Sequence, residues 1–122
     1  MVIVRVLMIG GSMMAATSTV AHAEWRYCLA PSDAARKVYL SDPFFTTAPF
    51  ESVEVAFGRI LRQFGLAYDT VQCPRGASAS QAGAMRDDAI KFNREFFRRA
   101  AVELPWTPAG SSLAGSGSGS AP

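Results

Sequence analysis

Histidine is almost absent from this chain of 122 residues, in which His22 is the single example. His22 also lies in an N-terminal segment, residues 1–23, that we expect to be removed. The remaining chain then has no imidazole, which excludes Ser-His and Cys-His nucleophiles, histidine general bases and histidine metal ligands. Lysine is also scarce, because only Lys37 and Lys91 are present. An enzyme made from this chain would have to use carboxylates, these two lysines or tyrosines.

The chain also lacks an uninterrupted run of the roughly 20 apolar residues that a membrane-spanning helix needs. Its most apolar part, residues 1–23, is interrupted by Gly10-Gly11-Ser12. Arg5 and the small residues of Ala21-His22-Ala23 give this part the layout of a signal peptide with a cleavage site. We therefore expect cleavage rather than a membrane anchor, a mature chain that begins at Glu24, and a periplasmic or secreted protein.

No large excess of charge of either sign is present. The formal net charge is +2, and it becomes +1 when Arg5 is removed with the signal peptide. So small a charge produces no long-range field that would attract a polyanion. We therefore expect no nucleic-acid partner, and contact with a membrane only during export.

Familiar catalytic and cofactor-binding motifs are missing as well. The sequence has no P-loop, no glycine-rich dinucleotide fingerprint, no His-Glu-x-x-His, no Cys-x-x-Cys and no internal repeat. We accordingly expect no cofactor and no metal site.

Only two cysteines are present, Cys28 and Cys73. In an oxidising compartment an even number of cysteines in a small domain predicts a disulfide. A bond between these two residues closes a loop of 46 residues, and the loss of chain entropy in the unfolded state then contributes about 4 kcal/mol of stability. An intermolecular disulfide and a redox-active pair are the alternatives, and the wide spacing disfavours the redox pair.

Residues 107–122 are rich in glycine, serine, alanine and proline and end in a Gly-Ser alternation. A segment of this composition buries too little apolar surface to offset its conformational entropy, so we expect a flexible tail. One small disulfide-linked domain, residues 24–106, remains. At this size a hydrophobic core alone gives marginal stability, and a covalent link adds to it.

Three strands and two helices are predicted to alternate along this domain. The first strand is Lys37–Ser41, which is rich in β-forming residues and is ended by Asp42-Pro43. The first helix follows from Pro49 to Gly65, where a proline suits the first turn and a glycine suits the C-terminal cap. Its apolar residues recur at spacings of three and four: Val53, Phe57, Ile60 and Phe64.

The second strand is expected at Ala67–Cys73. A capping box formed by Ser78 and Gln81 then predicts a longer helix that extends to about Ala100. Its apolar stripe consists of Ala82, Met85, Ala89, Phe92 and Phe96, widened by Phe97. The third strand is Ala101–Trp106, whose proline indicates an edge position.

This alternation predicts a small two-layer α/β domain with the order βαβαβ, in which both helices pack on one face of a short sheet. Polar and apolar residues alternate in the second and third strands, which favours a sheet with one solvent-exposed face over a sheet covered on both faces. A mainly α-helical fold, with the short segments as connections, is the alternative.

Carboxylates are the principal candidates for catalysis. Glu51 and Glu54 share a face of the first helix, whereas the adjacent Asp87 and Asp88 point about 100° apart on the second. The helix dipole favours acidic residues in the first turn, and this structural role is the simpler interpretation of the two glutamates.

An aromatic connection before the first helix is the first candidate for partner binding. This connection contains Phe44, Phe45 and Phe50 together with two prolines. Loops on rigid scaffolds often bind partners, and aromatic residues dominate interface energetics. Packing over the core is the simpler interpretation of these phenylalanines, at least one of which is expected to cover the start of the first helix. Exposure of Phe44 and Phe45 together would argue against it.

The second helix is the other candidate for binding, because Arg94, Arg98 and Arg99 lie among its phenylalanines. A basic and aromatic helix superficially suggests contact with nucleic acid or a membrane. Acidic residues four positions before Lys91 and Arg99 are spaced as ion pairs, however, and this pattern favours a solvated outer face.

We therefore expect a small exported interaction module, stabilised by one disulfide, that binds a protein or a component of the cell envelope through the connection from Phe44 to Phe50. This module has no intrinsic catalysis. The alternative is a carboxylate-dependent hydrolase of an envelope polymer, with Glu51 and Glu54 as its acids. A purely structural envelope protein is a third hypothesis.

Overall fold

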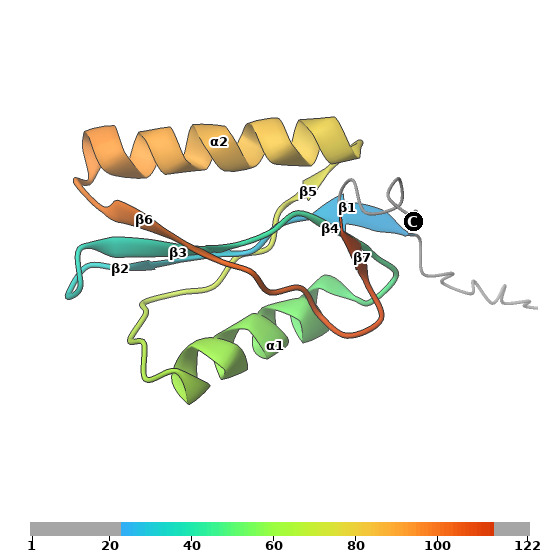
Figure 1. The fold of residues 1–122 in the computed structure, drawn as a ribbon, viewed down its shortest axis with the longest axis horizontal. Helices are drawn as coiled ribbons and strands as arrows, with labels where there is room; N and C mark the ends of the chain where they lie inside the picture. The colour runs from blue at the N-terminus through green and yellow to red at the C-terminus, as the bar shows by residue number, and fades with distance from the viewer. Residues whose placement is uncertain (1–22, 114–122) are drawn as a thin grey trace, which may run out of the picture.

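The computed structural model describes residues 23–113. It contains two helices, α1 (Phe50–Gln63) and α2 (Ala79–Phe96), and two small β-sheets with the strand orders β5-β1-β4-β7 and β2-β3-β6. The strands are β1 (Glu24–Arg26), β2 (Leu29–Ser32), β3 (Lys37–Ser41), β4 (Phe44–Thr46), β5 (Arg75–Gly76), β6 (Ala100–Leu104) and β7 (Ser112–Leu113). The protein therefore has an α/β fold, as predicted (Figure 1).

Two predicted segments lie largely outside the described residues. The predicted signal peptide is described only at Ala23, and the predicted tail only at residues 107–113. Within the described part of the tail, β7 pairs with β4 in antiparallel register, with Ser112 opposite Phe45. Backbone pairing with β4 thus gives Ser112 and Leu113 a defined strand conformation, although the composition of this segment alone favours coil.

The two helices lie on opposite faces of the sheet layer, with α2 above it and α1 below it in Figure 1. One core cluster packs against α2 and contains Tyr27, Leu29, Val38 and Leu40, with Met85, Ala89 and Ile90 from the helix. The other cluster joins α1 to the opposite face and contains Cys28, Ala30, Tyr39, Phe44, Val53, Phe57, Leu61 and Cys73. The prediction that both helices share one face is therefore wrong.

The sequence of β3 explains why both faces are covered. Val38, Tyr39 and Leu40 are consecutive and all three are buried, and successive residues of a strand point to opposite faces. A continuous apolar run of this kind is typical of strands that are covered on both sides. The predicted solvent-exposed face depended in part on residues 67–73, which form no strand.

Residues 67–73 instead run along the outer edge of β2. An isolated bridge joins Gln72 to Leu29, and the Asp69 N–H donates a hydrogen bond to the Pro31 carbonyl oxygen at 2.8 Å. Because Pro31 has no N–H of its own, it cannot donate to this segment. The predicted second strand is therefore wrong, and the segment covers an edge of the sheet without extending it.

The other two predicted strands are confirmed. Lys37–Ser41 is β3, and the third predicted strand corresponds to β6. β6 runs parallel to β3 and lies at an edge of its sheet, as expected from Pro105, which follows it. Five strands were not predicted, because each has only two to four residues and shows no periodicity: β1, β2, β4, β5 and β7.

Both predicted helices are confirmed, and the ends of α2 have clear causes. The helix begins at the predicted cap, where the Ser78 hydroxyl oxygen accepts a hydrogen bond from the Gln81 N–H at 3.1 Å. It ends at Phe96, earlier than predicted, because Ala100 pairs with Lys37 in the sheet. Neither described helix is long and apolar enough to cross a membrane.

The predicted apolar stripe of α2 is buried only in its first half. Phe92, Phe96 and Phe97 are exposed, so this part of the stripe does not pack on the sheet. The polar residues Arg86 and Asn93 are buried instead. The face of α2 that meets the sheet is therefore rotated from the face that the apolar residues alone indicate.

Hydrogen bonds explain how these polar side chains occupy the buried face. The Arg86 guanidinium donates to the Ser41 carbonyl oxygen at 2.7 Å and to the Glu103 carboxylate at 2.8 Å. The Asn93 side-chain amide donates to the Ala89 carbonyl oxygen at 2.8 Å. Buried polar groups that find partners in this way carry little penalty.

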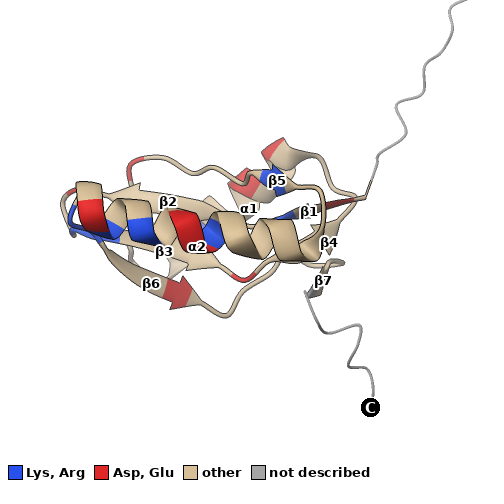
Figure 2. Cartoon of the chain, turned by 90° about the horizontal axis from the view of Figure 1, so that it is seen from above, with Lys and Arg blue, Asp and Glu red and all other residues tan. Residues whose placement is uncertain are grey.

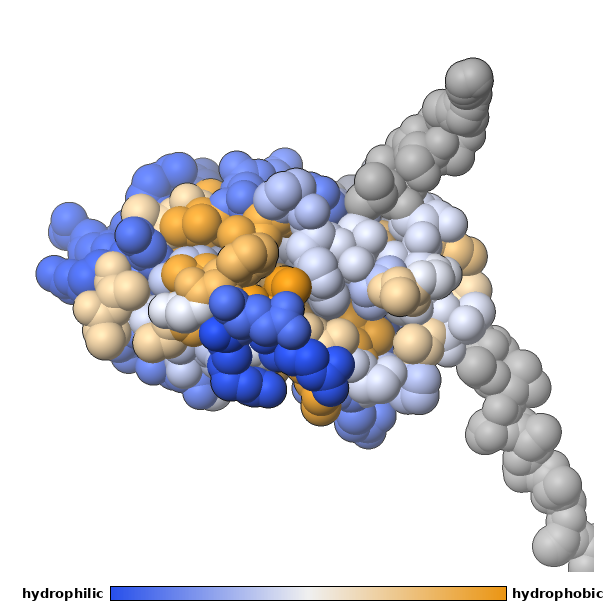
Figure 3. Space-filling view, turned by 60° about the horizontal axis from the view of Figure 1, so that its bottom comes forward, coloured by the Kyte–Doolittle hydropathy of each residue, from blue (hydrophilic) through white to orange (hydrophobic). Residues whose placement is uncertain are grey.

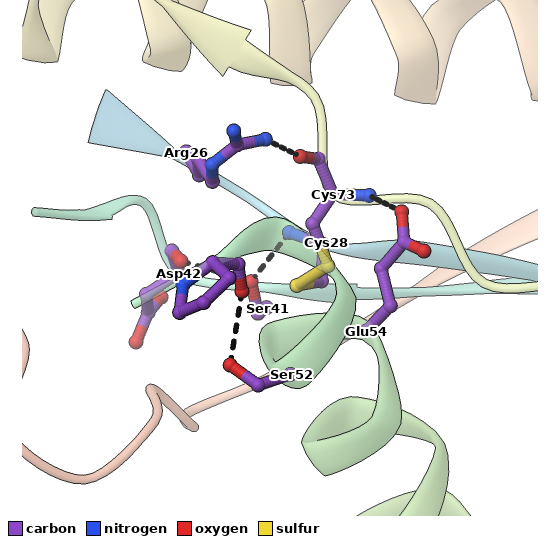
Figure 4. Close-up of a disulfide and its surroundings, with 8 residues drawn as sticks. Arg26, Cys28, Ser41, Asp42, Ser52, Glu54 and Cys73 are labelled. Carbon is purple, nitrogen blue, oxygen red and sulfur yellow. Dashed lines mark hydrogen bonds between the residues drawn. A yellow bond between two sulfur atoms is a disulfide. The ribbon is translucent and has the colours of Figure 1, made fainter. Parts of the chain in front are cut away.

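Cys28 and Cys73 form the predicted intramolecular disulfide, and both residues are buried. Figure 4 shows the hydrogen bonds around it. The Cys28 N–H donates to the Ser41 hydroxyl oxygen at 2.8 Å, and the Cys73 N–H donates to the Glu54 carboxylate at 3.3 Å. The Arg26 guanidinium donates to the Cys73 carbonyl oxygen at 2.5 Å. The disulfide thus lies where the sheet layer meets α1.

Candidate functional site

The structure divides the three phenylalanines of the predicted binding connection. Phe44 is fully buried and meets Trp106 edge to face, with ring centroids 6.4 Å apart. Phe45 is exposed and packs on Trp25 at 5.0 Å, whereas Phe50 is exposed at the start of α1 with the Arg26 guanidinium 5.7 Å from its ring. Phe44 is therefore a core residue, and the prediction that it contacts a partner is wrong.

A more concave site lies at the other end of α1. The end of this helix and the chain that leaves β6 enclose a cavity of about 370 Å³. We call it the apolar groove, and its lining residues are Ile60, Phe64, Leu66, Leu104, Pro105 and Trp106. Figure 3 shows hydrophobic side chains gathered on this side of the molecule, bordered by hydrophilic ones. The sequence placed Phe64 among the periodic apolar residues of the first helix and Trp106 at the end of the third predicted strand, and it did not indicate the groove.

Trp106 is the groove residue most firmly held by the core. Its ring lies 5.3 Å from the ring of Phe57, which is fully buried in α1. Contact with Phe44 on a second side adds to this packing. Because two buried aromatic rings hold the indole, this wall of the groove is already in place before any ligand binds.

The opposite wall is set by the way α1 ends. Gly65 has a positive φ of 71°, the Gly65 N–H donates to the Arg62 carbonyl oxygen, and the Leu66 N–H donates to the Leu61 carbonyl oxygen, both at 2.9 Å. These two bonds form a Schellman motif, which reverses the chain after a helix. The turn directs Leu66 back toward the groove and leaves Phe64 exposed at its rim.

We expect Gly65→Ala to lower the free energy of unfolding by about 1 kcal/mol, because a Cβ is disfavoured at positive φ. An added Cβ would meet no other atom within 4 Å, so the effect reports backbone conformation alone. Urea denaturation followed by circular dichroism measures it. Gly83→Ala in α2 is the matched control, since that position is equally open but helical, and it should be neutral or stabilising. Equal effects of both substitutions would contradict this account.

The predicted catalytic carboxylates do lie near one another. Glu51 and Glu54 both line an open depression of about 430 Å³ beside Arg62 and Tyr68. The Glu54 carboxylate accepts the hydrogen bond from the Cys73 N–H described above, so it has a structural role near the disulfide. Asp87 and Asp88 are exposed on α2. Among residues 23–113, no cluster of three or more histidines, cysteines and acidic residues is arranged to hold a metal ion.

The three predicted arginines have different surroundings. Arg94 and Arg98 are exposed, whereas Arg99 is held by the Asp33 carboxylate at 2.5 Å and by the Asn93 side-chain oxygen at 2.8 Å. Arg99 therefore pairs with Asp33, which is distant in the sequence, and not with Glu95, the acidic residue four positions earlier. Arg99 fixes the end of α2 to the turn between β2 and β3.

Two ionisable groups have shifted pKa values. Hydrogen bonding to Arg75, supported by Arg26 and opposed by desolvation, holds the pKa of Glu24 below its ordinary value. Burial raises the pKa of the Tyr27 phenol. Neither group lines the apolar groove.

Comparison with models of protein families, with curated proteins and with solved structures found no match. The functional argument therefore depends on the surfaces of the chain itself.

Proposed function

We propose that the protein is a small exported interaction module that binds an extended segment of a partner protein in the apolar groove and has no catalysis of its own. The observation that carries this proposal is the groove, a cavity of about 370 Å³ lined by apolar side chains. Binding pockets commonly have about 300–1,000 Å³ and a largely apolar lining. The disulfide supports export, because disulfides persist in oxidising compartments.

An extended peptide fits this site better than a folded surface does. β6 is an edge strand, and its last residue, Leu104, forms part of the groove wall. Exposed strand edges accept extended peptides through main-chain hydrogen bonds, while neighbouring pockets select alternate side chains. We therefore expect the partner segment to pair along β6 and to insert one aromatic or large aliphatic side chain beside Trp106.

Selection of peptides from a displayed random library tests this function directly. We expect the wild-type protein to enrich peptides with a bulky apolar residue, and the affinity of a selected peptide is then measured by titration calorimetry. Phe64→Ser should weaken binding by about tenfold or more, as expected for loss of an aromatic contact with the bound peptide. The protein should remain folded, because the Phe64 side chain is 64% exposed.

Phe50→Ser is the matched control, since Phe50 is an exposed phenylalanine at the opposite end of the same helix. It should leave the affinity unchanged. Loss of binding in Phe50→Ser with retention in Phe64→Ser would move the site to the connection predicted from the sequence. Failure to enrich any peptide would reject the proposal.

A carboxylate-dependent hydrolase of an envelope polymer is the second candidate function. It is favoured by the position of Glu51 and Glu54 on one depression with Tyr68. Release of soluble fragments from purified cell-wall polysaccharide tests it, and activity that Glu51→Gln abolishes would support it. The absence of any release by the wild-type protein would leave the two glutamates with their structural roles at the start of α1.

A further inference from the structure

The C-terminal end of α2 carries a group of aromatic rings that no core residue covers. Phe92, Phe96 and Phe97 are all exposed, Phe96 at 70%. The ring of Phe92 lies 4.8 Å from that of Phe96 and 5.4 Å from that of Phe97, between centroids. We call these three residues the aromatic tip. Contiguous exposed apolar patches are uncommon on monomeric proteins and mark sites of interaction.

Basic residues from two parts of the chain lie at the same end of the molecule as the aromatic tip. Three exposed basic residues come from α2 or from the short segment after it: Lys91, Arg94 and Arg98. The turn between β2 and β3 adds Arg36 and Lys37, because the Ala100 N–H donates to the Arg36 carbonyl oxygen at 3.0 Å and Lys37 pairs with Ala100. Figure 2 shows basic residues at this end of the molecule.

Acidic residues offset this charge only in part. Asp33 is engaged by Arg99 at 2.5 Å. The exposed Asp69 carboxylate accepts a hydrogen bond from the Asp33 N–H at 2.9 Å, and Glu95 is the exposed acidic residue on the last turn of α2. The net charge of the whole chain is only +2, so the basic character of this end is a local feature. The small net charge of the whole chain therefore does not indicate the positively charged aromatic surface at this end.

Phe97, at the end of the aromatic tip, is held by contacts with the rest of the fold. The Arg99 guanidinium carbon lies 4.3 Å from the centroid of the Phe97 ring, and Arg99 is itself bound by Asp33 and Asn93. The backbone carbonyl oxygen of the buried Asn93 also accepts hydrogen bonds from the backbone N–H groups of Phe97 and Arg99. A preformed surface of this kind loses little entropy when it docks.

We infer that the aromatic tip docks on the surface of an anionic membrane. Apolar rings that enter the interface beside lysines and arginines that meet anionic headgroups are the usual basis of peripheral attachment. The apolar groove and the depression at Glu51 and Glu54 are lined by other residues, so the rings themselves form the contact. A fluid lipid surface can close around such rings, whereas a protein partner needs a complementary hollow.

Sedimentation with lipid vesicles tests the inference. The N-terminus of the purified protein is first established by mass spectrometry. The protein is then mixed with anionic vesicles of phosphatidylcholine and phosphatidylglycerol, or with neutral vesicles of phosphatidylcholine alone. We expect partitioning to favour the anionic vesicles by about tenfold or more and to fall as salt is added. Phe96→Ser should reduce partitioning by about tenfold, because a buried phenylalanine ring is lost from the interface. The double substitution Arg94→Gln/Arg98→Gln should reduce it by a similar factor.

Matched controls lie on α1. Phe64→Ser removes an equally exposed phenylalanine and Arg59→Gln removes an exposed arginine, and neither should change partitioning. All variants should have the melting temperature of the wild-type protein, since the substituted side chains are exposed. Phe64→Ser separates this inference from the proposed peptide site, because it should lose peptide binding and keep vesicle binding.

Several outcomes would overturn the inference. One is equal partitioning to neutral and anionic vesicles, or none to either. Another is equal loss in Phe64→Ser and Phe96→Ser. A third is salt-sensitive binding to polyglutamate without binding to vesicles, which would point to an acidic protein partner. A fourth is a wild-type dimer that Phe96→Ser converts to monomers in sedimentation equilibrium, because the rings would then bind a second copy of the chain.

Discussion

Replacing Cys28 and Cys73 together with alanine is expected to lower the free energy of unfolding by about 4 kcal/mol. The disulfide joins residues separated by 45 positions, so its loss releases a long loop in the unfolded chain. The total free energy of unfolding of a small domain is roughly 5–15 kcal/mol. The variant should therefore be close to unfolding at room temperature. Urea denaturation followed by circular dichroism measures the loss.

Reduction of the wild-type protein provides the control for this experiment. A thiol reductant should shift the wild-type transition toward that of the double variant and leave the variant unchanged. Either single substitution, Cys28→Ala or Cys73→Ala, should cost about as much as the double one, because each removes the same bond. Identical transitions for the wild-type protein and all three variants would show that the disulfide contributes nothing to stability.

Phe57→Ala is expected to lower the free energy of unfolding by about 3–5 kcal/mol, the usual range for truncation of a buried phenylalanine. The Phe57 side chain is fully buried in α1 and packs on Trp106 at 5.3 Å. Its removal leaves a cavity under one wall of the apolar groove. Phe64→Ala is the control on the same helix, and it should change stability by less than about 0.5 kcal/mol because its ring is largely exposed.

Fluorescence gives a second reading of this substitution. In a Trp25→Phe background, emission from Trp106 should move to longer wavelength in Phe57→Ala, because the indole loses a buried neighbour. Peptide binding should weaken as well, although Phe57 does not line the groove. Equal stability losses in Phe57→Ala and Phe64→Ala would contradict the assignment of Phe57 to the core.

The apolar groove and the aromatic tip belong to different layers of the fold. The groove is formed by α1 and the chain after β6, and the tip is formed by α2 on the opposite side of the sheet layer (Figure 1). Occupation of one site therefore leaves the other accessible. On the two proposals together, vesicle-bound protein should bind the selected peptide with the affinity of the free protein.

Local sequence signals were sufficient wherever structure depends on neighbouring residues. The spacing of Val53 and Phe57 predicted α1, and Ser78 predicted the start of α2, because both depend on contacts within one or two helical turns. β3 was predicted because a segment rich in β-forming residues is followed by Asp42-Pro43. The two-residue strand β5 carries no such signal, since its pairing with β1 is provided by a distant segment.

The candidate site was predicted less well than the fold. The sequence indicated aromatic residues as the basis of binding. It named Phe44 as a binding candidate and placed Phe96 on the apolar stripe of the second helix, whereas Phe44 is buried and Phe96 is exposed. Hydrophobicity does not distinguish these two phenylalanines. Their burial depends on whether another element covers them, and Phe44 is covered by Trp106 from more than sixty positions away.

The sequence by itself determined the α/β class, both helices, β3, β6 and the pairing of the only two cysteines, because each of these follows from local pattern or from count. Only the tertiary structure decided that the helices cover opposite faces and that α2 meets the sheet through Arg86. That arginine is accommodated by the Ser41 carbonyl oxygen 45 positions away and by Glu103 17 positions away. Partners so distant in the chain decide which face of a helix is buried, and with it which phenylalanines are left for binding.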